Sequence, residues 1–220
     1  IIKDITFTQQ AGHKLSICGR TGSGKSTLLS CLFFLATLTS GEIYIDNIDI
    51  FTIPKDKLHS AIDSIPQQPF IIPGSVRENL SLGTTTTTTD DTMISTLSAV
   101  HLWTQILDHG GLDADIQSIH MSNGQQQLLY IARALLLPGK MVVLDEPTSG
   151  FDEHTEKLVQ GVLTEGFKNR TVISVAHRIR TIMDSDTVIV MGEGEICEIG
   201  TPEELLRRRG LFWELYHSQN

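Results

Sequence analysis

The residues with the clearest chemical signal form the stretch CGRTGSGKST, which follows a strand-like apolar run and opens a helical pattern. This spacing matches the glycine-rich loop that wraps backbone N–H groups around nucleotide phosphates. Lys25 would place a fixed charge on the β- and γ-phosphates, and the Ser26 hydroxyl would hold Mg²⁺. The stretch therefore predicts a site for ATP or GTP, whose expected contacts are Gly19, Thr21, Gly22, Ser23, Gly24, Lys25, Ser26 and Thr27.

Two carboxylates end an apolar run further along the chain, in MVVLDEPTSG. A run without polar alternation is typical of a strand buried on both faces. Because successive side chains of an extended segment point to opposite sides, Asp145 and Glu146 are expected to do different jobs. We assign Asp145 to the Mg²⁺ shell and Glu146 to the attacking water. The alternative is a strand that simply ends in a solvated acidic turn, and the glycine-rich loop upstream weighs against it.

Two more polar residues follow strand-like runs: His177 ends TVISVAH, and Gln67 lies in DSIPQQPF. Ligands of open α/β sheets sit beyond the carboxyl ends of the strands, which favours a common site for Gly19, Asp145 and His177. We expect His177 to contact the γ-phosphate and Gln67 to reach Mg²⁺ or the water. A lone histidine in such a place is more often a structural, hydrogen-bonded residue, so the other motifs carry this hypothesis.

A capped helix start lies in MSNGQQQLLYIARALL. Ser122 and Asn123 are good N-cap residues, and the exposed N–H groups and dipole of such an end attract phosphate. An ordinary capped helix that binds nothing is the commoner case. The residues alone leave both interpretations open.

The elements that must position these residues follow from the alternation of β-branched apolar runs with helical patterns. This alternation predicts an α/β fold with a mostly parallel sheet, and together with the glycine-rich loop at 19–26 it indicates a P-loop NTPase core. The strict alternation of EIYIDNIDI, with Asn47 as a turn residue, adds a small N-terminal antiparallel β subdomain. The expected strands are KLSIC, MVVLD, TVISVA and TVIVM, and the expected helices begin near Lys25, Asn123, His154 and Pro202.

The middle of the chain lacks the alternation of strand-like runs with helical patterns. Residues from about 90 to 135 show a helical pattern without a clear strand and are expected to form a helical insert. The six threonines at 84–89 suit a solvated linker. The apolar stretch LLSCLFFLATL, residues 28–38, is too short to span a bilayer and reads as a buried helix.

Composition narrows the function classes. The chain has 220 residues and a formal net charge of -9, from 17 Lys and Arg against 26 Asp and Glu, which argues against nucleic acid as a partner. Cys18, Cys31 and Cys197 lie in apolar stretches and are expected to be buried free thiols in a reducing, cytosolic compartment. Because the chain opens on Ile1 and shows no signal peptide, we expect a fragment of a longer protein.

Taken together, the motifs resemble the nucleotide-binding domain of ABC transporters over nearly the whole chain, residues 1–220. In family terms the P-loop spans 19–27, PQQP surrounds Gln67, MSNGQQQ is the signature motif, VVLDEPTSGFD is Walker B with the D-loop, and AHR contains His177. The helical subdomain at 90–135 would carry the signature. Stretches such as PGSVRENLSLG and GGLDAD are most similar to the second such domain of multidrug-resistance-protein-type (C-subfamily) exporters.

The resemblance implies a Mg²⁺-dependent ATPase that powers export of a substrate across a membrane. In this family the signature helix of one domain caps the γ-phosphate of ATP held by another, so two ATP lie between two head-to-tail domains. Implied partners are a second nucleotide-binding domain, in the same or another chain, and transmembrane domains. The implied location is the cytoplasmic face of a membrane, as part of an integral membrane protein.

The family roles carry over to named residues of this chain. Ser122, Gly124 and Gln125 would meet the ATP of the partner, and Asp152 would link the two sites. Gln67 would sense nucleotide and contact the transmembrane part, and His177 would hold the γ-phosphate.

Some features depart from the family pattern. Asn123, Gly150 and Phe151 are interpreted as variations at tolerant positions, and QSIHMS stands where exporters commonly carry a Gly-Glu pair. The aromatic residue that usually stacks on adenine precedes the first strand in the family, and we expect it upstream of this chain.

Two other functions remain open at this stage. One is a nucleotide-gated regulatory module of a channel or receptor assembly, in which turnover is incidental. The other is a soluble ABC protein of translation or DNA repair, which the negative charge and the lack of a long coiled-coil insert disfavour. An intact Glu146 favours a hydrolytic transporter domain.

Overall fold

The computed structural model describes residues 2–84, 88–148, 150–176 and 178–218. The chain forms two compact units, which are described separately below. The first contains Ile1–Ile62, Lys140–Glu146 and Asn169–Asn220, and the second contains Asp63–Gly139 and Pro147–Lys168. Among the described residues, no helix is long and apolar enough to cross a membrane.

The first unit is built on a mostly parallel sheet, as the alternating sequence pattern predicts. The order of the six strands is β4-β5-β6-β1-β7-β8, of which β4 has only its first residue, Ile62, in the first unit. Strand β1 pairs in parallel with β6 and β7, and β8 pairs antiparallel with β7. The inner strands are apolar runs buried along almost their whole length, as expected for strands covered on both faces. Their bounds are β1 Lys14–Gly19, β4 Ile62–Ile65, β5 Met141–Asp145, β6 Thr171–Val175, β7 Thr187–Gly192 and β8 Glu195–Gly200.

The edge strand β8 was not expected from the sequence. Its residues EICEIG alternate between exposed and half-buried, as in a strand with one face in solvent. The turn before it contains Glu193 at φ 53° and Gly194 at φ 88°, two positive values that suit a tight hairpin. This strand corrects the expectation that all three cysteines are buried, because Cys197 is exposed while Cys18 and Cys31 are buried. Burial raises the pKa of the Cys18 thiol to about 12.

A second, two-stranded sheet pairs β2 (Tyr44–Ile45) antiparallel with β3 (Ile48–Asp49), which confirms the small antiparallel element. Asn47 lies in its turn at φ 62°, within the left-handed region that asparagine tolerates. The helices of this unit are α1 Lys25–Leu32, α2 Lys55–Ala61, α8 Ile179–Met183, α9 Pro202–Arg208 and α10 Leu211–Ser218, with a 3₁₀ turn at Ile50–Thr52.

The helix expected over residues 28–38 is wrong in its second half. Helix α1 ends at Leu32, and Phe34 adopts φ 56°, a left-handed conformation that a helix cannot continue through. The backbone N–H groups of Leu35 and Ala36 both donate to the Ser30 carbonyl and close the helix end. Leu35 is left 79% exposed.

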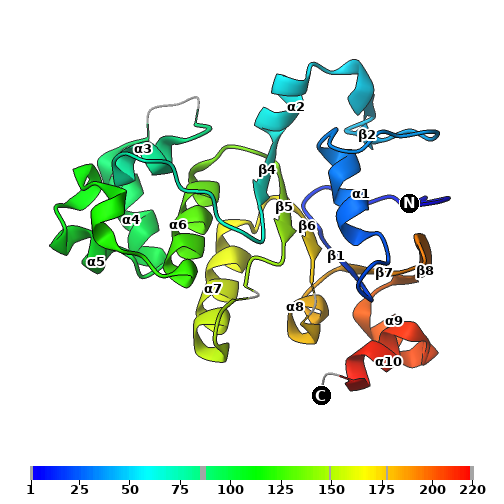
Figure 1. Cartoon of the computed structure of the whole chain (residues 1–220). Helices are drawn as coiled ribbons and strands as arrows, with labels where there is room; N and C mark the ends of the chain where they lie inside the picture. The colour runs from blue at the N-terminus through cyan, green and yellow to red at the C-terminus, as the bar shows by residue number, and fades with distance from the viewer. Residues whose placement is uncertain (1, 85–87, 149, 177, 219–220) are drawn as a thin grey trace. The chain divides into compact units, whose positions relative to one another are not determined.

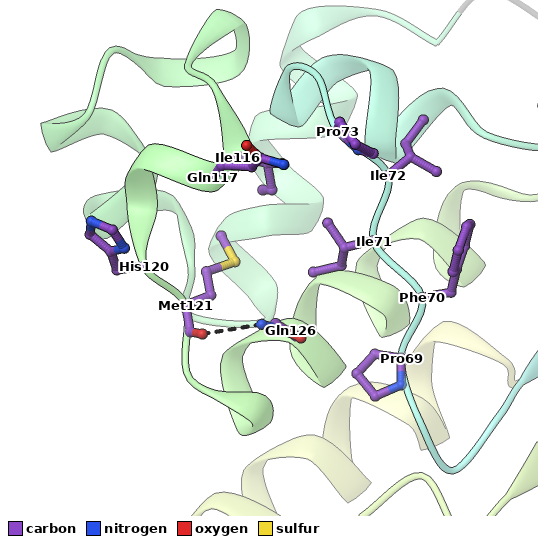
Figure 2. Close-up of a pocket in the computed structure, with 10 residues that line it drawn as sticks. All are labelled: Pro69, Phe70, Ile71, Ile72, Pro73, Ile116, Gln117, His120, Met121 and Gln126. Carbon is purple, nitrogen blue, oxygen red and sulfur yellow. Dashed lines mark hydrogen bonds between the residues drawn. The ribbon is translucent and has the colours of Figure 1, made fainter.

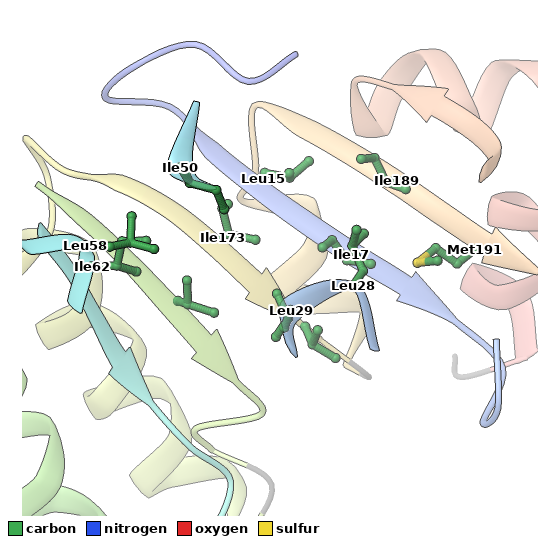
Figure 3. Packing of buried hydrophobic residues seen from close by; sticks show 12 residues of the cluster. Leu15, Ile17, Leu28, Leu29, Ile50, Leu58, Ile62, Ile173, Ile189 and Met191 are labelled. Atoms are coloured by element: carbon green, nitrogen blue, oxygen red, sulfur yellow. The ribbon is translucent and has the colours of Figure 1, made fainter. Parts of the chain in front are cut away.

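The core of the first unit lies between α1 and the sheet. Leu28 and Leu29 of α1 pack against side chains of β1, β6 and β7 in one buried cluster, and Ile50 and Leu58 extend it (Figure 3). This packing fixes α1 on the sheet and with it the loop between β1 and α1. A separate cluster packs α8, α9 and α10 around Val188, Val190 and Phe212.

The second unit is mainly helical. It contains α3 Val76–Ser81, α4 Asp90–Ala99, α5 Trp103–Asp108, α6 Asn123–Leu136 and α7 Glu153–Gly166, with 3₁₀ turns at Gly111–Asp113 and Ile116–Ile119 (Figure 1). The described residues of the expected insert at 90–135 form helices and 3₁₀ turns without a strand. In the threonine stretch, 85–87 lie outside the described residues, and the Thr89 hydroxyl caps α4 by accepting from the Thr92 N–H.

Candidate functional site

The loop between β1 and α1 is shaped by glycines. Gly19 ends β1 at φ 143°, and a Cβ added there would lie 2.2 Å from the carbonyl oxygen of Met191 in β7. A side chain at this position would therefore collide with backbone that cannot rotate away. Gly24 occupies the N-cap of α1 at φ 103°, which also favours glycine. The loop turns tightly because both ends take conformations that other residues resist.

Lys25 is folded into this loop. Its side chain is buried, and Nζ donates to the carbonyl oxygens of Gly19 at 2.9 Å and Arg20 at 3.1 Å. Burial lowers the pKa of Lys25, and the carboxylates of Glu146 and Asp145 oppose that shift by raising it. The structure thus brings the lysine of the loop within electrostatic reach of both carboxylates that the sequence singles out.

The loop also fits a phosphate group. The Ser23 hydroxyl oxygen is buried and has no hydrogen-bond partner among the described residues. A buried hydroxyl without a partner is unfavourable unless a ligand supplies one. Ser26, Thr21 and Gly22 are exposed, while Thr27 is half-buried. A positive charge, a glycine-lined turn and an unpaired hydroxyl together form a receptor for an oxyanion.

The two carboxylates follow β5 at the carboxyl edge of the sheet. Asp145 and Ile17 both lie level with Val175 of β6, so the ends of β5 and β1 lie on the same edge with one strand between them. Glu146 departs from the expectation of an extended pair. It adopts φ 50°, and its N–H donates to the Val175 carbonyl at 3.2 Å, so β5 ends at Asp145 and the strand alternation does not reach Glu146. Left-handed backbone at a non-glycine residue is a strained feature that clusters at functional sites.

His177, which the sequence singles out, lies outside the described residues. The preceding residue, Ala176, donates its N–H to the Ile17 carbonyl, so β6 reaches the same edge as β1. Gln67 lies in the second unit, two residues after β4, and its side chain is exposed.

In the second unit, Ser122 is the N-cap of α6. Its hydroxyl accepts from the Gln125 N–H at 3.3 Å, and the Gln125 side chain accepts from the Ser122 N–H at 2.9 Å, which forms a capping box. Gln125 also donates to the side-chain oxygen of Gln105 at 2.6 Å. Ser122 stays exposed, so the helix start is fixed by its own cap and still open to a ligand.

Gly124 lies against the loop after β5. A Cβ added to Gly124 would lie 3.2 Å from a ring carbon of Phe151, which is buried. Phe151 is therefore buried close to the start of α6, a packing position that the expectation of tolerance at residue 151 did not include. The next residue, Asp152, caps α7 by accepting from the N–H groups of His154 and Thr155. The sequence pattern SGFD did not show this capping role.

A pocket of about 560 Å³ opens on the second unit. Figure 2 shows the segment Pro69–Pro73 on one side and residues from Ile116 to Met121 on the other, with Gln126 of α6 between them. Gln126 donates to the Met121 carbonyl at 3.2 Å. The pocket connects the segment that follows Gln67 with the segment that precedes Ser122.

Comparison with known proteins agrees with this arrangement. The ABC transporter family pattern matches residues 2–149. The chain is 42% identical over 219 residues to "ABC multidrug transporter B" of Aspergillus fumigatus, covering 99% of this chain and 15% of that protein. It is 39% identical over 219 residues to "ATP-binding cassette sub-family C member 2" of Rattus norvegicus, covering 97% of this chain and 14% of that protein.

A solved structure of a bacterial Atm1-family ABC exporter with ATP bound matches with a TM-score of 0.92 and 30% identity, covering 100% of this chain and 39% of that one. The chain therefore spans about one seventh of the length of these curated relatives. With a family match over two thirds of its residues and a phosphate-binding loop of the required shape, the chain belongs to the ABC transporter family, as an ATP-binding domain.

Proposed function

We propose that the chain binds and hydrolyses Mg-ATP at the edge of the sheet where β1 and β5 end. The observation that carries this proposal is Lys25, buried in the glycine loop within reach of Asp145 and Glu146, beside the unpaired Ser23 hydroxyl. Backbone N–H groups of residues 19–27 and the Lys25 ammonium bind the phosphates. ATP rather than GTP is supported by the family and by the ATP-bound exporter.

The remaining roles divide among the carboxylates and their neighbours. Ser26, Asp145 and Gln67 would hold Mg²⁺, which when bound would neutralise phosphate charge. Glu146 orients the attacking water and accepts its proton, and His177 contacts the γ-phosphate. Glu146 suits this role because its left-handed backbone turns it out of the strand that carries Asp145.

We further propose that two such domains dimerise head to tail around two ATP, with Ser122, Gly124 and Gln125 of one domain against the ATP of the other. The exposed, pre-capped start of α6 supports this role, since its dipole favours an anion. Asp152, at the start of α7, joins the two sites. The second domain lies in the same chain or in another.

Export of a substrate across a membrane completes the proposal. The relatives are named as multidrug transporters and exporters, and the chain corresponds to a small part of them. The pocket between Pro69–Pro73 and residues 116–121 offers the transmembrane domains a surface of mixed polar and apolar side chains, next to Gln67 in sequence. The domain would then work at the cytoplasmic face of a membrane as part of an integral membrane protein.

The dimer is tested by Ser122→Arg in a Glu146→Gln background, in which ATP persists long enough for dimers to accumulate. ATP should drive the Glu146→Gln chain from monomer to dimer in light scattering. Ser122→Arg should abolish that dimer and change the monomer's affinity for ATP less than twofold, because residues 19–27 are intact.

Thr89→Arg is the matched control. Thr89 caps α4 through an acceptor distance of 3.3 Å, the same as that of Ser122, so both variants lose one helix cap worth about 1 kcal/mol. Only Ser122→Arg should prevent dimerisation. If Ser122→Arg weakens ATP binding in the monomer as much as loss of Lys25 does, the signature helix serves its own site and the two-domain mechanism is wrong.

A further inference from the structure

Helix α6, whose N-cap is Ser122, also donates hydrogen bonds to the segment that contains Gln67. The Gln127 side chain donates Nε2 to the Pro66 carbonyl at 3.1 Å, and the Arg133 guanidinium donates Nη1 to the Phe70 carbonyl at 3.2 Å. Both donors belong to α6 and both acceptors to the second unit. Six residues of helix separate the two donors by about 9 Å, so α6 holds the segment on either side of Gln67.

A third hold involves Asn79 of α3. Its side chain accepts from the Ile72 N–H and donates to the Ile72 carbonyl, both at 3.0 Å, much as a neighbouring strand would. Arg133 in turn donates Nε to the Asn79 carbonyl at 2.6 Å and Nη2 to the Asn79 side-chain oxygen at 3.3 Å. Arg133 and Asn79 are both buried. The segment from Pro66 to Ile72 is thus fixed through its backbone at three places.

Burying the polar groups of Gln127 and Arg133 costs folding free energy, so stability alone does not explain these contacts. Burial lowers the pKa of Arg133, which shows that its charged form is penalised inside the unit. The Gln127 carboxamide oxygen is buried and has no hydrogen-bond partner within the described part of the chain. A well-packed apolar side chain would avoid both penalties. Polar residues at 127 and 133 are therefore better explained by the geometry that they impose than by the stability that they add.

We propose that Gln127 and Arg133 are positioning residues that hold Gln67 in register with the signature helix, so that Gln67 and Ser122 respond to nucleotide as one body. The proposal rests on the function given above, in which Gln67 and Ser122 meet nucleotide. Figure 2 shows the part of the held segment from Pro69 to Ile72 running beside Gln126. A shift of α6 would carry the segment with it through the backbone carbonyls of Pro66 and Phe70.

Hydrogen exchange of the nucleotide-free 220-residue chain tests the grip directly. Gln127→Leu and Arg133→Lys should each raise exchange of the amides at 67–72 about tenfold, while amides of α6 stay within twofold of the parent. Gln126→Leu is the matched control, because the neighbouring Gln126 lies on the same helix and donates to the carbonyl of Met121, which precedes that helix, instead of to the segment 66–72. It should leave the segment within twofold. Unchanged exchange at 67–72 in both variants, or a uniform rise across the whole second unit, overturns the proposal.

Measurements of ATP turnover distinguish a positioning role of Gln127 and Arg133 from a purely structural one. At a temperature where every variant is folded, Gln127→Leu should lower ATP turnover at saturation about tenfold and leave the half-saturating Mg-ATP concentration within twofold. Arg133→Lys, which keeps the charge and one set of donors, should lose less turnover than Arg133→Gln. A loosened segment with normal turnover overturns the positioning role. If the parent chain itself hydrolyses no ATP, the proposed function fails, and the exchange experiment still decides whether α6 holds the segment.

Discussion

Replacement of Lys25 by methionine should separate binding from stability. The change removes two hydrogen bonds to the Gly19 and Arg20 carbonyls, each worth about 1 kcal/mol net. It also removes a buried ammonium whose pKa is lowered in the folded state by burial. A lowered folded pKa means that the charged form is penalised, fully so at every pH below that folded pKa. The lost hydrogen bonds destabilise the folded chain, whereas removal of the buried charge stabilises it, so the unfolding free energy should change by about 1 kcal/mol or less.

The effect on ATP should be far larger. Ligand at 100 times its dissociation constant stabilises a folded protein by about 2.7 kcal/mol, which for a chain of this size corresponds to a rise of about 5–10 °C in Tm. Scanning calorimetry with and without Mg-ATP should show this rise in the parent. Lys25→Met should begin within about 4 °C of the parent and show no rise with Mg-ATP.

An exposed lysine provides the control. Lys57→Met, in α2 of the same unit, removes a charge at the surface and should keep the full rise with Mg-ATP. If Lys25→Met retains the ATP-induced rise, the phosphate-binding role of the β1–α1 loop is wrong. If Lys25→Met unfolds without nucleotide, the lysine is structural and the opposing terms have been misjudged.

Three further outcomes are expected. Glu146→Gln should keep the ATP-induced rise in Tm and lower phosphate release by roughly 10²-fold, as loss of a positioned base does, and release at the parent rate would remove Glu146 from the mechanism. Asp145→Asn should raise the Mg²⁺ concentration needed for half-maximal ATP binding by about tenfold, because a charged ligand becomes neutral, and an unshifted Mg²⁺ titration would contradict its role. Gly124→Ala gains about 1 kcal/mol of helix propensity but crowds Phe151 at 3.2 Å, so monomer stability should barely change while ATP-driven dimerisation weakens, as light scattering would show. Normal dimers of Gly124→Ala would argue against a phosphate contact at the start of α6.

The parallel core and the phosphate loop were predictable because their signals are local. Fully buried strands are continuous apolar runs, and the conformations at Gly19 and Gly24 require the residue type that the sequence provides there. The edge strand β8 escaped prediction because Glu195, Cys197 and Glu198 dilute its apolar pattern. The Glu-Gly pair at 193–194 was the available hairpin signal.

Polar side chains inside the second unit could not be found in the same way. Gln127 and Arg133 sit on a helix whose buried positions are otherwise apolar, and their acceptors are the carbonyls of Pro66 and Phe70. Every residue type has a carbonyl, so the sequence around 66–70 carries no mark of the contact. Such a pair becomes visible only when the fold brings α6 beside the segment.

The division of the chain into two units explains why the Gln67 segment needs the hydrogen bonds from α6. Glu146 is the last residue of its segment in the first unit, and Pro147 begins the next segment of the second. Gln67 lies a few residues after Asp63, where the first segment of the second unit starts. Glu146 thus lies directly before a crossing between units and Gln67 a few residues after one, where covalent attachment alone leaves a polar side chain many orientations. Glu146 is fixed by its hydrogen bond to Val175 and its left-handed turn, within the first unit. Gln67 has to be fixed by the second, and α6 is the element there whose start is proposed to meet nucleotide. A helix that contacts phosphate and is hydrogen-bonded to the Gln67 segment would shift that segment when ATP binds. No contact between Gln67 and Ser122 would be needed.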